Sequence, residues 1–146
     1  MDHLQISLLS PSAKAPARQR AGDLGYDLHA DEAATLAPGE RAVISAGFAM
    51  ALPAGVAAFI VPRSGAALRE GLSIVNSPGL IDGGYRGAVS VIAINLGQEP
   101  ISIRVGDRVA QMVLVPALTP QIEVVDALAS SEDGRGAAGF GSSGKR

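Results

Sequence analysis

The chain has 146 residues, of which 47% are hydrophobic and 18% are charged, so its length and composition are those of one folded domain rather than a disordered segment. It contains no cysteine, which excludes disulfides, iron–sulfur clusters and a cysteine nucleophile, and its two histidines are too few for a multi-histidine metal site. The net charge of −2 argues against a nucleic-acid partner. No apolar run is long enough to span a membrane, and no basic signal-peptide region is present, so we expect a cytoplasmic protein.

The predicted elements are short strands separated by turn residues. The 18 glycines and 9 prolines interrupt the chain at intervals of about 8 to 12 residues, and the runs between them are rich in valine and isoleucine, which is typical of a β-sandwich or β-barrel. In chain order, we predict strands at residues 4–8, 26–30, 41–45, 48–52, 56–61, 72–75, 80–81, 89–95, 101–105, 109–115 and 122–125. The one helix signal covers residues 64–69, where Ser64 can cap the start and Gly71 can end the helix. We therefore expect an all-β domain with one short helix.

The sequence Pro62-Arg63-Ser64-Gly65 lies where a buried strand is expected to pass into this helix. The start of a helix attracts anions because its free N–H groups and its dipole point outward, so an arginine and a serine at this place suit a phosphate group. An ordinary helix cap without a ligand is the alternative interpretation of the same residues.

A second cluster is the glycine-rich stretch from Gly79 to Gly87, which carries Asp82, Tyr85 and Arg86 within five residues. Glycines allow a ligand to approach the backbone closely, so an acid, an aromatic ring and a guanidinium become available to it. The alternative interpretation is a glycine-rich hairpin whose side chains are only solvated.

The last part of the chain, residues 130–146, differs in composition from the rest, because it is rich in glycine and has a single aromatic residue, Phe140. Such a segment cannot bury enough apolar surface to fold by itself, so it is either a frayed end or a segment that becomes ordered over a ligand. In the second case Arg135, Ser142 and Ser143 would supply a charge and two hydroxyl groups.

Five motifs in this order resemble those of the trimeric dUTP pyrophosphatase (dUTPase) family; they lie at residues 21–30, 62–65, 76–87, 106–112 and 135–142. The resemblance implies a jelly-roll domain, or distorted β-barrel, over residues 1–129. It also implies a flexible glycine-rich C-terminal arm over residues 130–146 that closes over the active site. The family assembles as a homotrimer in which all three chains contribute to each active site.

The resemblance also implies an activity, the hydrolysis of dUTP to dUMP and pyrophosphate, which supplies the dTMP precursor and limits uracil incorporation into DNA. Asp82 would orient and deprotonate the water that attacks the α-phosphorus. Mg²⁺ would be the cofactor, held mostly by the triphosphate and by water, and Asp27 would anchor this hydrated ion indirectly or order the pocket. The expected partners are dUTP and further copies of the chain, without nucleic acid or membrane.

The remaining matched positions would bind the substrate. Those expected to hold phosphate oxygens are Arg63, Ser64, Gly65 and Gln111, joined from the arm by Arg135, Ser142 and Ser143, and Gly141 is a further expected substrate-binding residue. The hairpin residues Asn76, Leu80 and Ile81 would recognise uracil, and Tyr85 would pack on the deoxyribose. Phe140 would stack on the base when the arm closes.

Two alternatives to this function remain open at the level of the sequence. One is an enzyme like dCTP deaminase, which has a related fold. The other is a catalytically silent nucleotide-binding module that keeps the fold. The presence of Asp82, Tyr85, Arg63, Ser64 and the arm favours the dUTPase interpretation.

Overall fold

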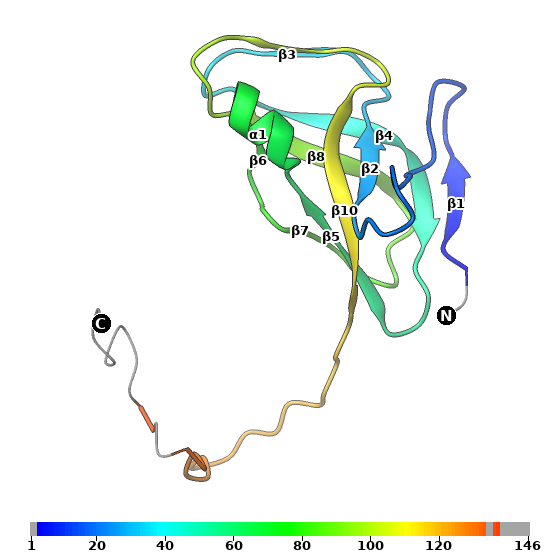
Figure 1. The fold of residues 1–146 in the computed structure, drawn as a ribbon. Helices are drawn as coiled ribbons and strands as arrows, with labels where there is room; N and C mark the ends of the chain where they lie inside the picture. Colours follow the sequence, from blue (N-terminus) through cyan, green and yellow to red (C-terminus); the bar gives the residue numbers. More distant parts are fainter. Residues whose placement is uncertain (1–2, 134–135, 138–146) are drawn as a thin grey trace.

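Two four-stranded antiparallel sheets face each other across one apolar core in the computed structural model, which describes residues 3–133 and 136–137 (Figure 1). The first sheet has the order β1-β4-β8-β6, the second has the order β2-β10-β5-β7, and β3 pairs with β9 in a small third sheet. The described strands are β1 (Gln5–Leu8), β2 (Tyr26–His29), β3 (Ala34–Leu36), β4 (Arg41–Ala51), β5 (Val56–Val61), β6 (Leu72–Ile74), β7 (Gly79–Ile81), β8 (Ala88–Asn95), β9 (Ile101–Ile103) and β10 (Arg108–Pro116). The predicted all-β, jelly-roll-like class is thus confirmed.

Alternation of side chains builds the core. In β8, Val89, Val91 and Ala93 are buried, while Ser90 and Ile92 between them point outward. This period of two is what a sheet with one buried face requires. Residues distant in the sequence share this core, since Phe48 of β4 and Met112 of β10 are both fully buried in it.

Residues 41–45 and 48–52, predicted as two strands, form the single long strand β4. The strand is interrupted by a register shift between Ser45 and Ala49, where Gly47 takes a positive φ of 72°. A bulge of this kind bends a strand without ending it, which the glycine signal alone does not distinguish from a turn. The short strand β3 was not predicted.

The predicted helix is confirmed as α1 (Ser64–Glu70), and Gly71 ends it in the left-handed conformation, with φ at 75°. The prediction that Ser64 caps the helix is wrong. Arg63 occupies the cap position in an extended conformation, and no side chain makes a cap hydrogen bond. Ser64 is therefore the first helical residue, and its exposed hydroxyl is available to a ligand.

The predicted strand at residues 122–125 is wrong. After β10 the chain leaves the two sheets and runs away from them, without strand pairing in its described part (Figure 1). Ile122 and Val124 are each 94% exposed there. Their alternating pattern is that of a strand, but the described part of one chain offers it no partner. No helix in the described ranges is long and apolar enough to cross a membrane.

Candidate active site

Strand pairing gathers residues of three separate motifs at one end of the second sheet. Gln111 of β10 lies between Asp27 of β2 on one side and Val61 of β5 on the other. Immediately after Val61, the chain turns through Pro62 into the start of α1. Residues far apart in the sequence therefore meet around the first turn of the helix.

These residues line a cavity of about 310 Å³, which we call the cradle. The predicted site residues that line it are Asp27, Arg63, Ser64, Gly65 and Gln111, together with Gln19, Asp23, Leu24 and Gly25. The lining is polar and carries a guanidinium, a hydroxyl and the start of a helix. Groups of this kind bind phosphate oxygens.

Asp27 lies at the base of the cradle with 8% of its surface exposed. Its Oδ1 accepts a hydrogen bond from Arg63 Nε at 2.9 Å, and its Oδ2 accepts from Arg108 Nη1 at 3.2 Å and from Gln19 Nε2 at 2.9 Å. A buried carboxylate is tolerated when it is paired and hydrogen-bonded in this way. Asp27 thus aligns two arginines rather than offering a free charge to the cavity.

The backbone of Gly25 makes room for Gln111. A Cβ atom built on Gly25 would collide with Oε1 of the Gln111 side chain. The same side chain donates from Nε2 to the carbonyl oxygen of Pro62 at 2.9 Å. Gln111 is consequently fixed between β5 and the Gly25 backbone, at the wall of the cradle.

The hairpin carrying Asp82 forms a second, separate group of predicted site residues. Asn76, Leu80, Asp82 and Tyr85 are exposed, and Ile81 is half-buried. None of these five lines the cradle. Within the described ranges, the Asp82 carboxylate makes no hydrogen bond or ion pair, so it is free to act on a ligand.

Arg86 holds the turn that presents Asp82. Its Nη1 donates to the carbonyl oxygens of Gly83 at 2.8 Å and of Tyr85 at 2.7 Å. Tyr85 Oη in turn donates to the carbonyl oxygen of Ala88 at 3.0 Å. These bonds give a fixed shape to a turn with two adjacent glycines.

The cradle and the hairpin lie at opposite ends of β5. Register places Ile81 opposite Ala58, and a Cβ on Gly83 would lie 3.5 Å from the carbonyl oxygen of Val56. Arg63 follows the other end of the strand. Continuing this register by one residue would place Asp82 beside Ala57, which lies six residue steps from Arg63, a distance of about 20 Å. One chain therefore cannot apply Asp82 and Arg63 to the same phosphate group.

Some predictions lie outside the described residues. These are the arm residues Arg135, Phe140, Gly141, Ser142 and Ser143. Their roles, and the arm as a unit, remain predictions.

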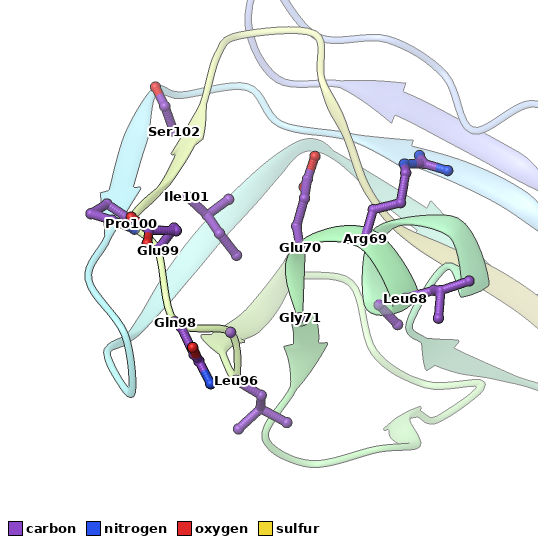
Figure 2. Close-up of a pocket in the computed structure, with 12 residues that line it drawn as sticks. Leu68, Arg69, Glu70, Gly71, Leu96, Gln98, Glu99, Pro100, Ile101 and Ser102 are labelled. Carbon is purple, nitrogen blue, oxygen red and sulfur yellow. The ribbon is translucent and has the colours of Figure 1, made fainter.

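A larger cavity, of about 560 Å³, lies between the C-terminal half of α1 and residues 96–102 (Figure 2). Figure 2 shows Arg69 and Glu70 on the helical side and Glu99, Pro100 and Ser102 on the other. No predicted site residue lines it. We therefore assign the candidate site to the cradle, although this second cavity is larger.

Sequence reasoning assigned no role to Gln19, which lines the cradle, to Arg108, which pairs with Asp27, or to His29 nearby. Arg108 stands opposite His29 in the pairing of β10 with β2. The Nδ1 atom of His29 is buried and has no hydrogen-bond partner in the described chain. Burial and the positive charges of Lys14, Arg108 and Arg63 lower the pKa of His29 against the opposing effect of Asp27.

No group of three or more histidine, cysteine, aspartate or glutamate side chains is gathered within the described ranges. A metal ion held by a protein cage therefore has no donor set there. A Mg²⁺ ion that arrives with a triphosphate needs few protein ligands, because phosphate and water oxygens fill its coordination sphere. The cradle suits such a metal–phosphate unit, with Asp27 as its one buried carboxylate.

The fold and the cradle are those of a β-sheet protein with a polar cavity that suits phosphate groups. The family model for dUTPase matches residues 11–144, so the chain belongs to the dUTPase family. The deoxyuridine 5'-triphosphate nucleotidohydrolase of Anaeromyxobacter sp. (strain Fw109-5) is 47% identical over 97% of this chain and 95% of its own. That of Leifsonia xyli subsp. xyli (strain CTCB07) is 49% identical over 90% and 86%.

Solved structures agree with this membership. A mutant dUTPase of Staphylococcus bacteriophage 80alpha, determined with dUpNHpp, has a TM-score of 0.91 and 31% identity, covering 99% of both chains. A mutant dUTPase from phage phi11 of S. aureus, whose structure shows the coordination of a structural Mg(II) ion, has a TM-score of 0.83 and 30% identity. It covers 88% of this chain and 100% of that one.

Proposed function

We propose that this protein is a dUTP diphosphatase that hydrolyses dUTP to dUMP and pyrophosphate. The observation that carries the proposal is the cradle, in which Arg63, Ser64, Gly65 and Gln111 line one polar cavity in a chain of the dUTPase family. The relatives are named for hydrolysis of deoxyuridine triphosphate, which favours this activity over dCTP deamination or silent nucleotide binding. The product supplies the dTMP precursor and the reaction limits uracil in DNA, in the cytoplasm.

The cradle holds the phosphates in this mechanism. Arg63 is aligned by its Nε bond to Asp27 and by a longer bond, of 3.4 Å, from Nη1 to the carbonyl oxygen of Arg108, which leaves Nη2 for phosphate oxygens. The Ser64 hydroxyl and the Gly65 backbone N–H add donors at the start of α1. Charge and donors placed in advance around the transferring group provide most of the catalysis in phosphoryl transfer.

Asp82 acts as the general base. Its exposed carboxylate accepts a proton from the water that attacks the α-phosphorus, and Arg86 keeps the turn beneath it in place. Asn76, Leu80 and Ile81 recognise the uracil edge, and Tyr85 packs on the deoxyribose. Arg135, Phe140, Gly141, Ser142 and Ser143 close over the nucleotide as part of an arm formed by residues 130–146.

The cofactor is Mg²⁺, which neutralises charge on the triphosphate when it is bound. Both Asp27 oxygens already accept hydrogen bonds from this chain. The geometry therefore favours Asp27 as a residue that orders the pocket, and an ion anchored to it through water is the alternative role. Titration of the Asp27→Asn variant with Mg²⁺, with nucleotide affinity measured at each concentration, distinguishes a pocket-ordering role from an ion-anchoring role.

The active form is a homotrimer with shared active sites. The distance of about 20 Å between Asp82 and Arg63 along β5 supports this assembly, because a second copy must bring its hairpin to the cradle of the first. Exposed apolar side chains support it as well. Val43 and Ile92 are exposed cross-strand neighbours on the outer face of the first sheet, and the exposed Val75 lies beside them, where its N–H donates to the carbonyl oxygen of Ile92. Rings built from one repeated contact between identical chains are common.

The direct test of the activity is to mix the purified protein with Mg²⁺ and either dUTP or dCTP. Release of pyrophosphate from dUTP is the expected result. Release of ammonia from dCTP would instead favour the deaminase, and binding without turnover would favour the silent module.

Shared sites are tested by complementation. Co-expressed chains carrying either Asp82→Asn or Arg63→Gln should recover about a quarter of wild-type activity in a random ring, since each intact site needs one sound hairpin and one sound cradle from different chains. The control pairs Arg63→Gln with Gln111→Ala, two changes in one cradle, and should recover no more activity than either variant has alone. Equal recovery in both pairs, or none in either, would contradict the shared site.

A further inference from the structure

We propose that Gln19 is a positioning residue of the cradle, which keeps the negative charge of Asp27 turned toward the arginines and away from the bound phosphates. The inference rests on the proposed function of the cradle as the phosphate site. Gln19 belongs to none of the five motifs. It lies seven positions before Tyr26, the first residue of β2, in the connecting segment that begins near Ser10, and the course of this segment brings it to the cradle.

The need for such a residue follows from the placement of Asp27. A carboxylate at the base of an anion-binding cavity repels phosphate unless its charge is directed elsewhere. Arg63 binds one carboxylate oxygen through Nε at 2.9 Å, which fixes Oδ1. The contact of Arg108 with Oδ2 is longer, at 3.2 Å, and the Arg108 side chain is 43% exposed. Arg108 alone therefore holds Oδ2 loosely.

Gln19 supplies the shorter bond to the same oxygen. Its Nε2 donates to Oδ2 at 2.9 Å, and the residue also lines the cradle. With this third donor, Oδ2 accepts a second and shorter hydrogen bond, so that each carboxylate oxygen of Asp27 is held by a donor at 2.9 Å. A neutral amide suits the position because it donates a hydrogen bond without adding charge.

The segment around Gln19 is itself anchored, so the amide is presented in a fixed position. The carbonyl oxygen of Ala17 accepts the N–H of Asp27 at 2.8 Å. The guanidinium of Arg18 lies 5.4 Å from the centre of the Tyr26 ring, a distance at which a cation and a ring attract each other. The same short segment thus holds both the backbone and the side chain of Asp27.

Two substitutions isolate the role. Gln19→Met keeps the length of the side chain and removes the hydrogen bond. Gln19→Glu keeps the shape and places a second carboxylate against Asp27. The control is Gln98→Glu, which makes the same change of charge on an exposed glutamine that lines the cavity of Figure 2 instead of the cradle. Gln19 is itself exposed, so we expect all three variants to fold.

The experiment measures the binding of inorganic pyrophosphate by calorimetry, the KM and kcat for dUTP, and thermal melting. Gln19→Met should weaken pyrophosphate binding and raise KM by about 3- to 10-fold, because a hydrogen bond to a charged group is lost, while kcat changes less than about twofold. Gln19→Glu should have a larger effect, of at least about 10-fold, because like charges then face each other. Gln98→Glu should leave all values unchanged.

Three results would overturn the proposal. Unchanged affinity in both Gln19 variants, with only a lower melting temperature, would make the contact purely structural. An equal loss of affinity in Gln98→Glu would make the effect one of overall charge. A fall in kcat at constant KM would place Gln19 in the chemical step. Failure of the wild-type protein to hydrolyse dUTP would contradict the proposed function instead, and pyrophosphate binding would still test Gln19.

Discussion

The cradle and the hairpin differ in how far one chain completes them. In the cradle, Asp27, Arg63 and Gln111 are fixed by hydrogen bonds to groups of the same chain. In the hairpin the backbone is fixed by Arg86, but Asp82 is exposed and makes no bond within the described ranges, and Tyr85 is 46% exposed. In the proposed mechanism, one chain therefore organises the phosphate-binding groups by itself, whereas the proposed base, Asp82, remains available to another molecule.

The largest expected effect comes from removing residues 134–146, which belong to neither the cradle nor the hairpin. Truncation after Asp133 should lower kcat/KM for dUTP by several orders of magnitude, because the proposed arm excludes water and completes the phosphate contacts. Melting without ligand should barely change, since the strands end at Pro116. Turnover, thermal melting and light scattering of both lengths provide the check. Full activity of the shortened chain would make residues 134–146 a frayed end.

A change confined to the hairpin should act on chemistry alone. Asp82→Asn is nearly isosteric and removes only the base, so kcat should fall by about 10²- to 10⁴-fold while nucleotide binding persists. Steady-state kinetics and calorimetry with dUTP measure the two effects separately. A decrease of less than about tenfold in kcat would exclude Asp82 as the base and make Asp27 the next candidate.

A change confined to the cradle should act through geometry. Gly25→Ala places a methyl group where Oε1 of Gln111 lies, so Gln111 must move, and kcat/KM should fall by about 100-fold. The matched control is Gly22→Ala, because a Cβ at Gly22 meets nothing within 4 Å. Equal kinetics for the two variants would show that the position of Gln111 is unimportant to turnover.

Sugar selection should belong to the hairpin. The wild-type protein should prefer dUTP to UTP by at least about 100-fold, and Tyr85→Ala should reduce this preference by about 10-fold because the ring no longer excludes a 2′-hydroxyl. Tyr85→Phe removes only the hydroxyl that bonds Ala88 and should keep the preference. Competition kinetics with both nucleotides is the measurement. An unchanged preference in Tyr85→Ala would assign sugar selection to other residues.

The smallest effect concerns pH and the strand beneath the cradle. Burial lowers the pKa of His29 below its ordinary value near 6.5, so on acidification the unfolded chain takes up this proton before the folded chain. Stability is therefore lost as the pH falls below about 7. His29→Gln should reduce the difference in melting temperature between about pH 7.5 and about pH 5.5 by about 1–2 °C. An identical pH dependence in the variant would assign the loss to other groups.

Local patterns predicted those features that depend on neighbouring residues. The strand predicted at residues 89–95 and the short helix that Gly71 ends are of this kind, and the motif residues of the cradle were recognised through their resemblance to a family. Other features depend on residues distant in the sequence. Arg108 meets Asp27 across 81 positions, and no local signal announces that pairing. The strand predicted at residues 122–125 is wrong for a related reason, because an alternating pattern does not show whether the same chain contains a strand to pair with it.

The length of β5 has a consequence for how this protein can change. Its six residues, Val56–Val61, separate the hairpin from the cradle, and β10 spans the same interval from Gln111 to Pro116. In the proposed ring, each subunit gives its hairpin to one site and its cradle to another. The distance between hairpin and cradle within a subunit must therefore match the distance between neighbouring active sites. Adding two residues to the paired strands would displace one half of every site by about 7 Å, while the core of the subunit could remain well packed. Insertions are tolerable in the loops, but the number of residues in these two strands is a dimension of the assembly.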